Sequence, residues 1–93
     1  MNDKEAHSLL TDCLQRYRVQ SYDDLRKLIG HVETKEVTGP SGRKYRTEFQ
    51  IFWDDRPNGN IRVMGSIDDG GLRAFVPVTH SFIKTPTGQF VGE

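Results

Sequence analysis

The chain has 93 residues, of which 28% are charged and 10% are aromatic. This length has room for one modest hydrophobic core, so we expect a single domain over residues 1–93, with a helical pair in residues 1–30 and an antiparallel sheet in residues 31–93. The 13 basic side chains balance the 13 acidic ones. Net charge therefore draws the protein neither to nucleic acid nor to an anionic membrane.

The only cysteine of the chain, Cys13, cannot form a disulfide bond within it. No apolar run approaches the length of the apolar part of a signal sequence or of a membrane span. We therefore expect a cytoplasmic protein that does not enter the membrane.

The N-terminal third contains two segments with the apolar spacing of helices. In the first segment, apolar residues recur at steps of three and four: Ala6, Leu9, Leu10, Cys13, Leu14 and Tyr17. Asn2 or Asp3 can cap its start. In the second segment, Ser21 and Asp24 have the spacing of a capping box, and Gly30 stands where a left-handed residue ends a helix. We predict two helices here, the second only about two turns long.

From His31 onward the apolar period changes from about 3.6 to 2. Three runs alternate apolar with other residues and predict half-buried antiparallel strands: 45–53, 61–67 and 72–78. The polar run HVETKEVT indicates an edge strand, and HSFIK and QFVGE predict a small terminal hairpin. The expected fold is α+β, with two N-terminal helices packed on one face of a four- to five-stranded antiparallel β-meander in a two-layer sandwich.

Loop lengths and alternation together predict how the strands pair. A loop over residues 55–59 and a two-residue turn at Asp69-Gly70 both place apolar side chains opposite one another. The first hairpin then pairs Trp53 with Ile61, Ile51 with Val63 and Phe49 with Gly65. The second pairs Ile67 with Leu72, Gly65 with Ala74 and Val63 with Val76.

Two pairs of adjacent aspartates, Asp54–Asp55 and Asp68–Asp69, raise the question of a carboxylate site. The strand between them holds seven residues at about 3.3 Å each, so its ends lie roughly 20 Å apart. That separation is too large for a shared metal ion or a catalytic carboxylate pair. We interpret both pairs as turn residues, and an enzyme or metal site at a single Asp-Asp turn stays a third hypothesis.

The remaining polar residues do not form a motif for catalysis or for metal binding. Cys13 falls on the apolar stripe of the first helix, where we expect it to be buried. His7, His31 and His80 lack the spacing of metal ligands. We therefore expect no catalytic residue, no cofactor and no metal, and we lean toward a protein that is not an enzyme.

A basic run, Arg43, Lys44, Tyr45 and Arg46, supports an alternative function. Basic side chains around an aromatic residue on a sheet can bind single-stranded nucleic acid. Acidic residues in the same strands oppose this reading because they cancel much of the positive field: Glu33, Glu36 and Glu48. We consider a nucleic-acid partner the second hypothesis, and an improbable one.

The sheet face turned away from the helices carries the lead hypothesis. The predicted register places Met64 opposite Phe75, with Phe52 diagonal to Met64. Apolar surface with an arginine-rich rim has the composition of a protein interface. The candidate interface consists of Phe52, Met64, Phe75, Arg62 and Arg73. We expect a small non-enzymatic domain that binds a protein partner or forms a homodimer through this face, unless Phe82, Ile83 or Phe90 of the terminal hairpin covers it.

Overall fold

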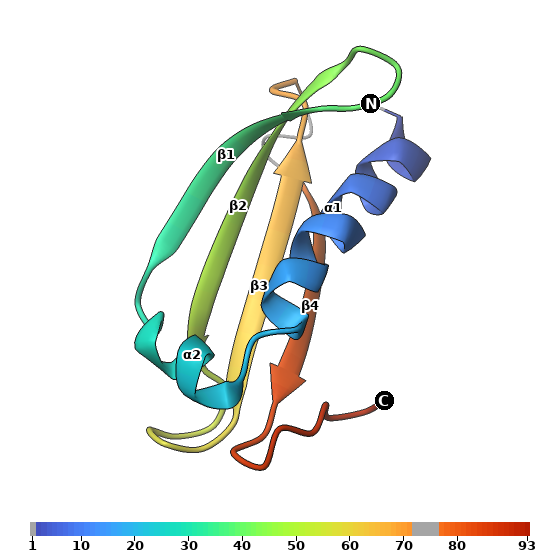
Figure 1. The fold of residues 1–93 in the computed structure, drawn as a ribbon. Coiled ribbons are helices and arrows are strands. Elements are labelled where there is room, and N and C mark those ends of the chain that lie inside the picture. Colours follow the sequence, from blue (N-terminus) through green and yellow to red (C-terminus); the bar gives the residue numbers. More distant parts are fainter. Residues whose placement is uncertain (1, 72–76) are drawn as a thin grey trace.

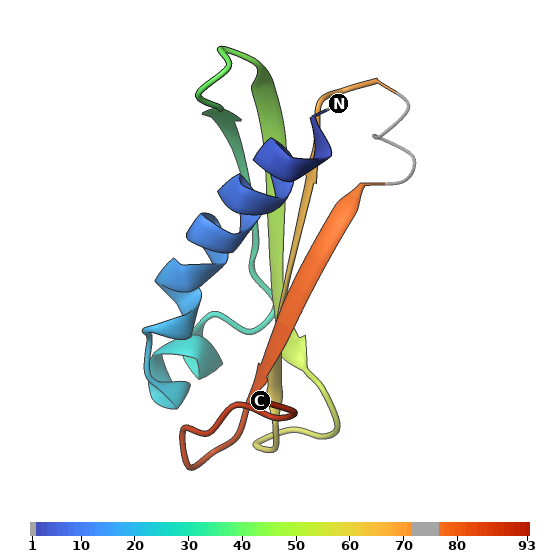
Figure 2. The same ribbon diagram turned by 90° about the vertical axis from the view of Figure 1, so that its right-hand side faces the viewer.

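The structure is a computed structural model and describes residues 2–71 and 77–93. Two helices precede four strands in the chain: α1 (Asp3–Arg18), α2 (Tyr22–Lys27), β1 (Val32–Thr38), β2 (Lys44–Trp53), β3 (Ile61–Asp68) and β4 (Val78–Lys84). The strands pair antiparallel in the order β1-β2-β3-β4. Helix α1 runs diagonally across β3 and β4 (Figure 1), and both helices lie on the same side of the sheet (Figure 2). The predicted α+β fold is confirmed.

Both helices begin at the predicted caps. The side-chain oxygen Oδ1 of Asn2 accepts a hydrogen bond from the backbone N–H of Glu5 at 3.1 Å. The hydroxyl of Ser21 accepts one from the N–H of Asp24, also at 3.1 Å. These bonds satisfy N–H groups that have no partner inside the helix. Gly30 has a φ of 87°, which is the left-handed conformation that its position after α2 requires.

The core lies between α1, α2 and the inner face of the sheet, which is the face turned toward the helices. Helix α1 contributes every third or fourth residue, and each strand of the central pair contributes alternate residues. The most completely buried apolar side chains are Ala6, Leu10, Leu25, Tyr45, Ile61, Val63 and Ile67. The opposite face, which we call the outer face, carries the intervening residues of each strand.

The hairpin between β2 and β3 has the predicted register. Trp53 pairs with Ile61, and Ile51 pairs with Val63. The connecting loop contains Asn58 with a φ of 65°, a left-handed conformation that asparagine tolerates better than most residues. A loop of the predicted length therefore places both apolar pairs on the inner face.

The predicted register of the next hairpin is wrong. Strand β4 covers Val78–Lys84, so Ile67 pairs with Val78, Gly65 with His80, and Val63 with Phe82. The predicted two-residue turn gave these three β3 residues other partners. Those partners lie outside the described residues: Leu72, Ala74 and Val76. The observed pairing buries the large ring of Phe82 in the core, with 4% of its surface exposed.

The backbone at Asp69-Gly70 gives the physical reason. A two-residue turn of type I′ needs positive φ at both central residues. Gly70 has a φ of 85°, but Asn58 is the sole residue other than glycine with positive φ in residues 2–71 and 77–93. Asp69 therefore does not adopt the conformation of that turn, and the connection from β3 to β4 is longer.

The segment after β4 returns on the helix side of the sheet. Residues 85–88 turn, and the predicted terminal hairpin is reduced to one isolated bridge between Lys84 and Phe90. The Phe90 ring lies 5.7 Å from that of Phe82, and the guanidinium carbon of Arg18 lies 4.0 Å from the Phe90 centroid. Phe82 and Phe90 therefore do not cover the outer face, whereas Ile83 lies on it.

In residues 2–71 and 77–93 we find no helix whose length and apolar character would let it cross a bilayer.

Candidate functional site

The outer face carries a group of apolar side chains around one arginine. Arg62 of β3 pairs with Phe52 of β2 on one side and with Ile83 of β4 on the other. Met64 lies two residues after Arg62 on the same face. Val32 of β1 pairs with Gln50 of β2, which in turn pairs with Met64. We call this set the outer patch: Val32, Phe52, Arg62, Met64 and Ile83.

The apolar members of the outer patch are accessible to different degrees. Val32 has 59% of its surface exposed, whereas Phe52, Met64 and Ile83 are partly exposed. Beside Val32 and Phe52 the surface forms a shallow hollow of about 320 Å³. These apolar side chains share one face of the sheet, with Gln50 and Arg62 between them, and apolar surface bordered by polar residues is typical of binding surfaces.

The arginine at the centre of the outer patch is fixed in place. Its Nε donates to Oδ1 of Asp54 at 2.8 Å, and its Nη1 donates to the Ser81 hydroxyl at 2.9 Å. Two bonds to different groups hold the plane of the guanidinium, and the charge of Asp54 offsets that of Arg62. The outer patch is therefore a preorganised surface without an unbalanced charge at its centre.

One pairing of the predicted interface is wrong, and two of its five residues cannot be placed. The β4 partner of Met64 is Ser81, so the predicted pairing of Met64 with Phe75 is wrong. Phe75 and Arg73 lie outside the described residues. The structure confirms the diagonal placement of Phe52 and Met64, with Arg62 beside Phe52.

Sequence reasoning missed Val32 and Ile83 as members of the outer patch. Val32 belongs to the predicted edge strand and Ile83 to the apolar run HSFIK, so the strands themselves were recognised. The missing information was that HSFIK pairs directly with β3. Alternation within HSFIK, once that pairing is known, places Ile83 on the outer face.

Three of the four aspartates in the two pairs act as turn residues, as the sequence indicated, whereas Asp54 forms the ion pair with Arg62. Oδ1 of Asp55 accepts hydrogen bonds from the backbone N–H groups of Arg56 and Asn60, both at 2.8 Å. Oδ1 of Asp68 accepts from the N–H of Gly70 at 2.9 Å. The backbone bond from Arg56 is the main reason why the pKa of Asp55 lies below its ordinary value. These contacts shape loops and do not converge on a ligand.

No group of three or more histidine, cysteine, aspartate or glutamate side chains that could together hold a metal ion is found in residues 2–71 and 77–93. The structure nevertheless brings together two residues that the sequence left scattered. Nδ1 of His7 on α1 lies 2.6 Å from Nε2 of His80 on β4.

The basic strand does not present an aromatic ring to solvent. Tyr45 points into the core with 1% of its surface exposed, and its hydroxyl donates to Glu5 at 2.8 Å. Arg43 forms an ion pair with Asp69 at 3.3 Å. Stacking of bases requires an accessible ring, so Tyr45 cannot serve as a stacking platform beside these basic residues.

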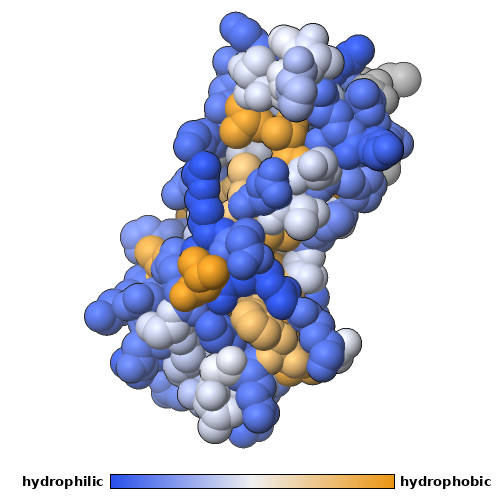
Figure 3. Space-filling view, turned by 45° about the vertical axis from the view of Figure 1, so that its right-hand side comes forward, coloured by the Kyte–Doolittle hydropathy of each residue, from blue (hydrophilic) through white to orange (hydrophobic). Residues whose placement is uncertain are grey.

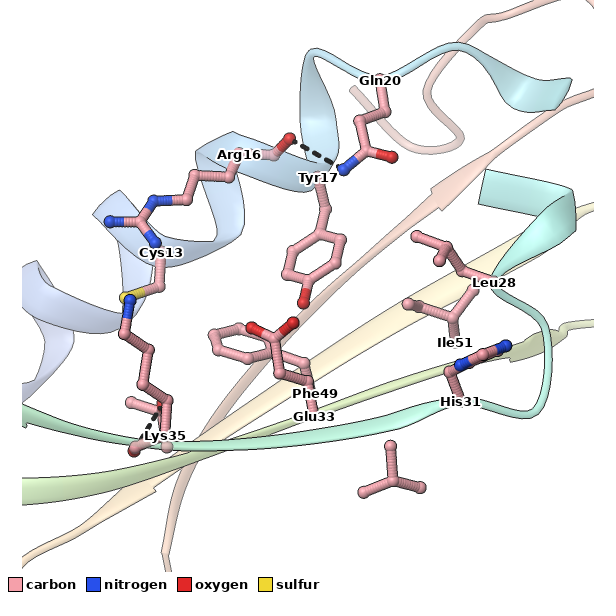
Figure 4. A pocket seen from close by; sticks show the side chains of 12 residues that line it. Cys13, Arg16, Tyr17, Gln20, Leu28, His31, Glu33, Lys35, Phe49 and Ile51 are labelled. Carbon is pink, nitrogen blue, oxygen red and sulfur yellow. Dashed lines mark hydrogen bonds between the residues drawn. The ribbon is translucent and has the colours of Figure 1, made fainter. Parts of the chain in front are cut away.

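A cleft of about 440 Å³ separates α1 from β1 on the inner face of the sheet (Figure 4). The Tyr17 hydroxyl points across it toward Glu33. Burial and the negative charge of Glu33 raise the pKa of Tyr17 to about 12. Cys13, which we predicted to be buried, is only partly buried and lines the cleft. Cys13 and His31 stand at opposite ends of it (Figure 4), so the thiol has no histidine base within reach there.

On the part of the helix side that Figure 3 shows, the described apolar side chains are scattered. Figure 3 shows this side with the β4 edge turned forward, and apolar side chains form small areas separated by hydrophilic ones. Small separated apolar areas are normal for a protein surface. Among the surfaces described, the outer patch is therefore the better candidate for binding.

Comparison of the chain with protein-family models, with curated proteins and with solved structures finds no match.

Proposed function

We propose that the protein is a non-enzymatic binding module that associates with another protein chain through the outer patch. The observation that carries the proposal is the position of Arg62, which Asp54 and Ser81 hold in place among the apolar side chains of the patch. The free thiol of Cys13 accords with a reducing compartment, and we propose the cytoplasm as the location.

The composition of the outer patch supports a protein partner. Phenylalanine, methionine and arginine are enriched at protein interfaces, while lysine and glutamate are depleted. A side chain that is already ordered loses less conformational entropy on binding than a mobile one. Because two hydrogen bonds hold Arg62 before binding, its side chain loses little conformational entropy when an interface forms.

A second copy of the chain is the partner that fits best. In a twofold-symmetric dimer each copy presents the same surface to the other, so apolar residues meet apolar residues. Like charges would oppose this arrangement if Arg62 were unpaired, but Asp54 balances its charge within each copy. The outer patch is thus complementary to itself in both polarity and charge.

The experiment is a measurement of molar mass by sedimentation and light scattering over a wide range of protein concentration. The wild type should exceed the monomer mass at high concentration. Met64→Lys should be monomeric because it places an unpaired charge in the interface. Ser66→Lys is the matched control, since Ser66 lies on the outer face of the same strand but outside the patch. A wild type that stays monomeric throughout would contradict the proposed self-association.

A second variant tests the role of the fixed arginine. Asp54→Ala removes the bond to Nε of Arg62 but leaves the apolar residues of the patch unchanged. We expect weaker association and a folded monomer. Association of unchanged strength in Asp54→Ala would show that the orientation of Arg62 does not matter for binding.

A further inference from the structure

The pair formed by His7 and His80 is a separate feature on the other side of the sheet. Their rings stand 4.8 Å apart at an angle of 48°, with Nδ1 of His7 facing Nε2 of His80 at 2.6 Å. The two residues are 73 positions apart in the chain. The pair joins the first half of α1 to β4.

The facing nitrogens share a single proton. A neutral imidazole has one N–H group and one nitrogen with a free lone pair, so in the hydrogen bond one ring donates and the other accepts. If the donor ring moves its proton to its outer nitrogen, both facing nitrogens carry lone pairs directed at each other. Two neutral rings reach this state by exchange with water, with no net release of protons.

A transition-metal ion binds both nitrogens only after the two rings turn toward a common point, because at present the nitrogens face each other along one line. Metal–imidazole bonds of about 2.0–2.1 Å, at angles from tetrahedral to square, place the two nitrogens roughly 2.9 to 3.4 Å apart. The observed separation of 2.6 Å would widen by less than an ångström. His7 is exposed, so its side chain can rotate by that amount and water can reach the ion.

The surroundings are compatible with a cation. Gly65 pairs with His80 across the sheet and has no side chain that could obstruct the ion. The chain neighbours of His80, Thr79 and Ser81, are uncharged.

We propose that His7 and His80 bind a divalent transition-metal ion of the Zn²⁺, Ni²⁺ or Cu²⁺ class, with water in the remaining coordination positions. The ion cross-links α1 to β4. Imidazole is a suitable ligand for these metals and not for Mg²⁺ or Ca²⁺, which prefer oxygen. The site is independent of the outer patch, because His80 lies on the inner face of the sheet.

The test is thermal unfolding of the full chain, without a polyhistidine tag, in the presence of NiCl₂ alone. At pH 7.5 the melting temperature should rise with metal concentration, by on the order of 10 °C at a hundredfold excess over Kd. MgCl₂ should have no such effect.

Three variants locate the site. His7→Gln and His80→Gln should each abolish the rise, whereas His31→Gln should retain it because His31 lies just before β1, away from the pair. Circular dichroism of each variant without metal checks that it is folded. The proposal is overturned if Ni²⁺ does not stabilise the wild type, or if the rise survives in either His7→Gln or His80→Gln.

Discussion

The carboxylate of Glu5 accepts a hydrogen bond from the Tyr45 hydroxyl at 2.8 Å. The same carboxylate accepts two more bonds, from the backbone N–H of Ser41 at 2.9 Å and from its hydroxyl at 2.8 Å. Glu5 lies in the first turn of α1, whereas Ser41 and Tyr45 belong to the β1–β2 connection and to β2. The Glu5 side chain therefore connects the start of α1 to the start of β2 and the loop before it.

The Glu5 contacts predict a dependence of stability on pH. Hydrogen bonds from Ser41 and Tyr45 hold the pKa of Glu5 below its ordinary value of 4.5 in the folded protein. A carboxyl group whose pKa is lower in the folded state stabilises the fold above its unfolded pKa, and this stabilisation disappears as the pH falls through the folded pKa. We expect Glu5→Gln to melt several degrees lower at pH 7 and to lose less stability than the wild type below pH 4.5.

Thermal unfolding from pH 7 to pH 3 checks this expectation, with Asp12→Asn as the control. Asp12 is an exposed carboxylate on the same helix. Tyr45→Phe removes only the hydroxyl, so its effect and that of Glu5→Gln should be less than additive if the bond couples them. Parallel pH profiles for Glu5→Gln and the wild type would refute the assigned role.

A second prediction concerns Gly65, over which α1 crosses the sheet. A Cβ atom at this position would lie 2.6 Å from Cε1 of Phe49 and 3.0 Å from Cδ1 of Leu10. Because both side chains are buried, neither can move away without disturbing the core. Gly65→Ala should destabilise the protein by about 1–3 kcal/mol in urea unfolding. Gly71→Ala is the control, since the nearest contact of its Cβ would be at 3.5 Å. Equal stability of the two variants would contradict the close packing.

How much could be predicted from the sequence depended on how local the information was. The helix caps at Asn2 and Ser21 and the left-handed Gly30 involve residues within one turn of each other, so the sequence was sufficient to locate them. The β2–β3 register followed because a single loop length fits the alternation on both sides. Capping patterns and loop length were therefore enough to predict the helix ends and the β2–β3 hairpin.

The β3–β4 register was not accessible in the same way. Two consecutive runs, residues 72–78 and HSFIK, both alternate, and either can present apolar residues to β3. What distinguishes them is tertiary: the observed pairing buries Phe82 and brings Lys84 to the end of α1. The contact between His7 and His80 depends on the same β3–β4 register. Because the turn after β3 was predicted wrongly, this contact could not be predicted either.

A third prediction concerns the buried ammonium group of Lys84. Its Nζ donates to the backbone carbonyl of Gln20 at 2.6 Å and to that of Arg18 at 3.3 Å, and only 8% of the residue's surface is exposed. Arg18 is the last residue of α1 and Gln20 follows it, so both carbonyls lie at the C-terminal end of the helix, where a positive charge is favourable. Lys84→Met should therefore lower the free energy of unfolding by about 2 kcal/mol. Lys4→Met, which changes an exposed lysine, should have little effect in the same denaturant titration. If Lys84→Met proved as stable as the wild type, the hydrogen bonds of the ammonium group would not stabilise the C-terminal end of α1.

The last prediction addresses the cleft between α1 and β1 at alkaline pH. Burial and the neighbouring Glu33 raise the pKa of Tyr17 from its ordinary value of 10.0 to about 12. A group whose folded pKa is raised supports the fold below its unfolded pKa, and this support is lost as the pH rises toward the folded value. Between pH 10 and pH 12 the wild type should therefore lose more stability than Tyr17→Phe. Tyr17→Phe keeps the ring, which packs 5.1 Å from that of Phe49, so core packing is preserved.

Denaturant unfolding at several pH values checks the Tyr17 prediction. Glu33→Gln provides the matched variant, because it removes the negative charge from the cleft but leaves the Tyr17 phenol in place. Since the charge of Glu33 is the second cause of the raised pKa after burial, Glu33→Gln should give an intermediate profile, between those of the wild type and Tyr17→Phe. A Glu33→Gln profile identical to that of the wild type would leave burial alone as the cause. Identical profiles for all three proteins would mean that Tyr17 is not held neutral by the cleft.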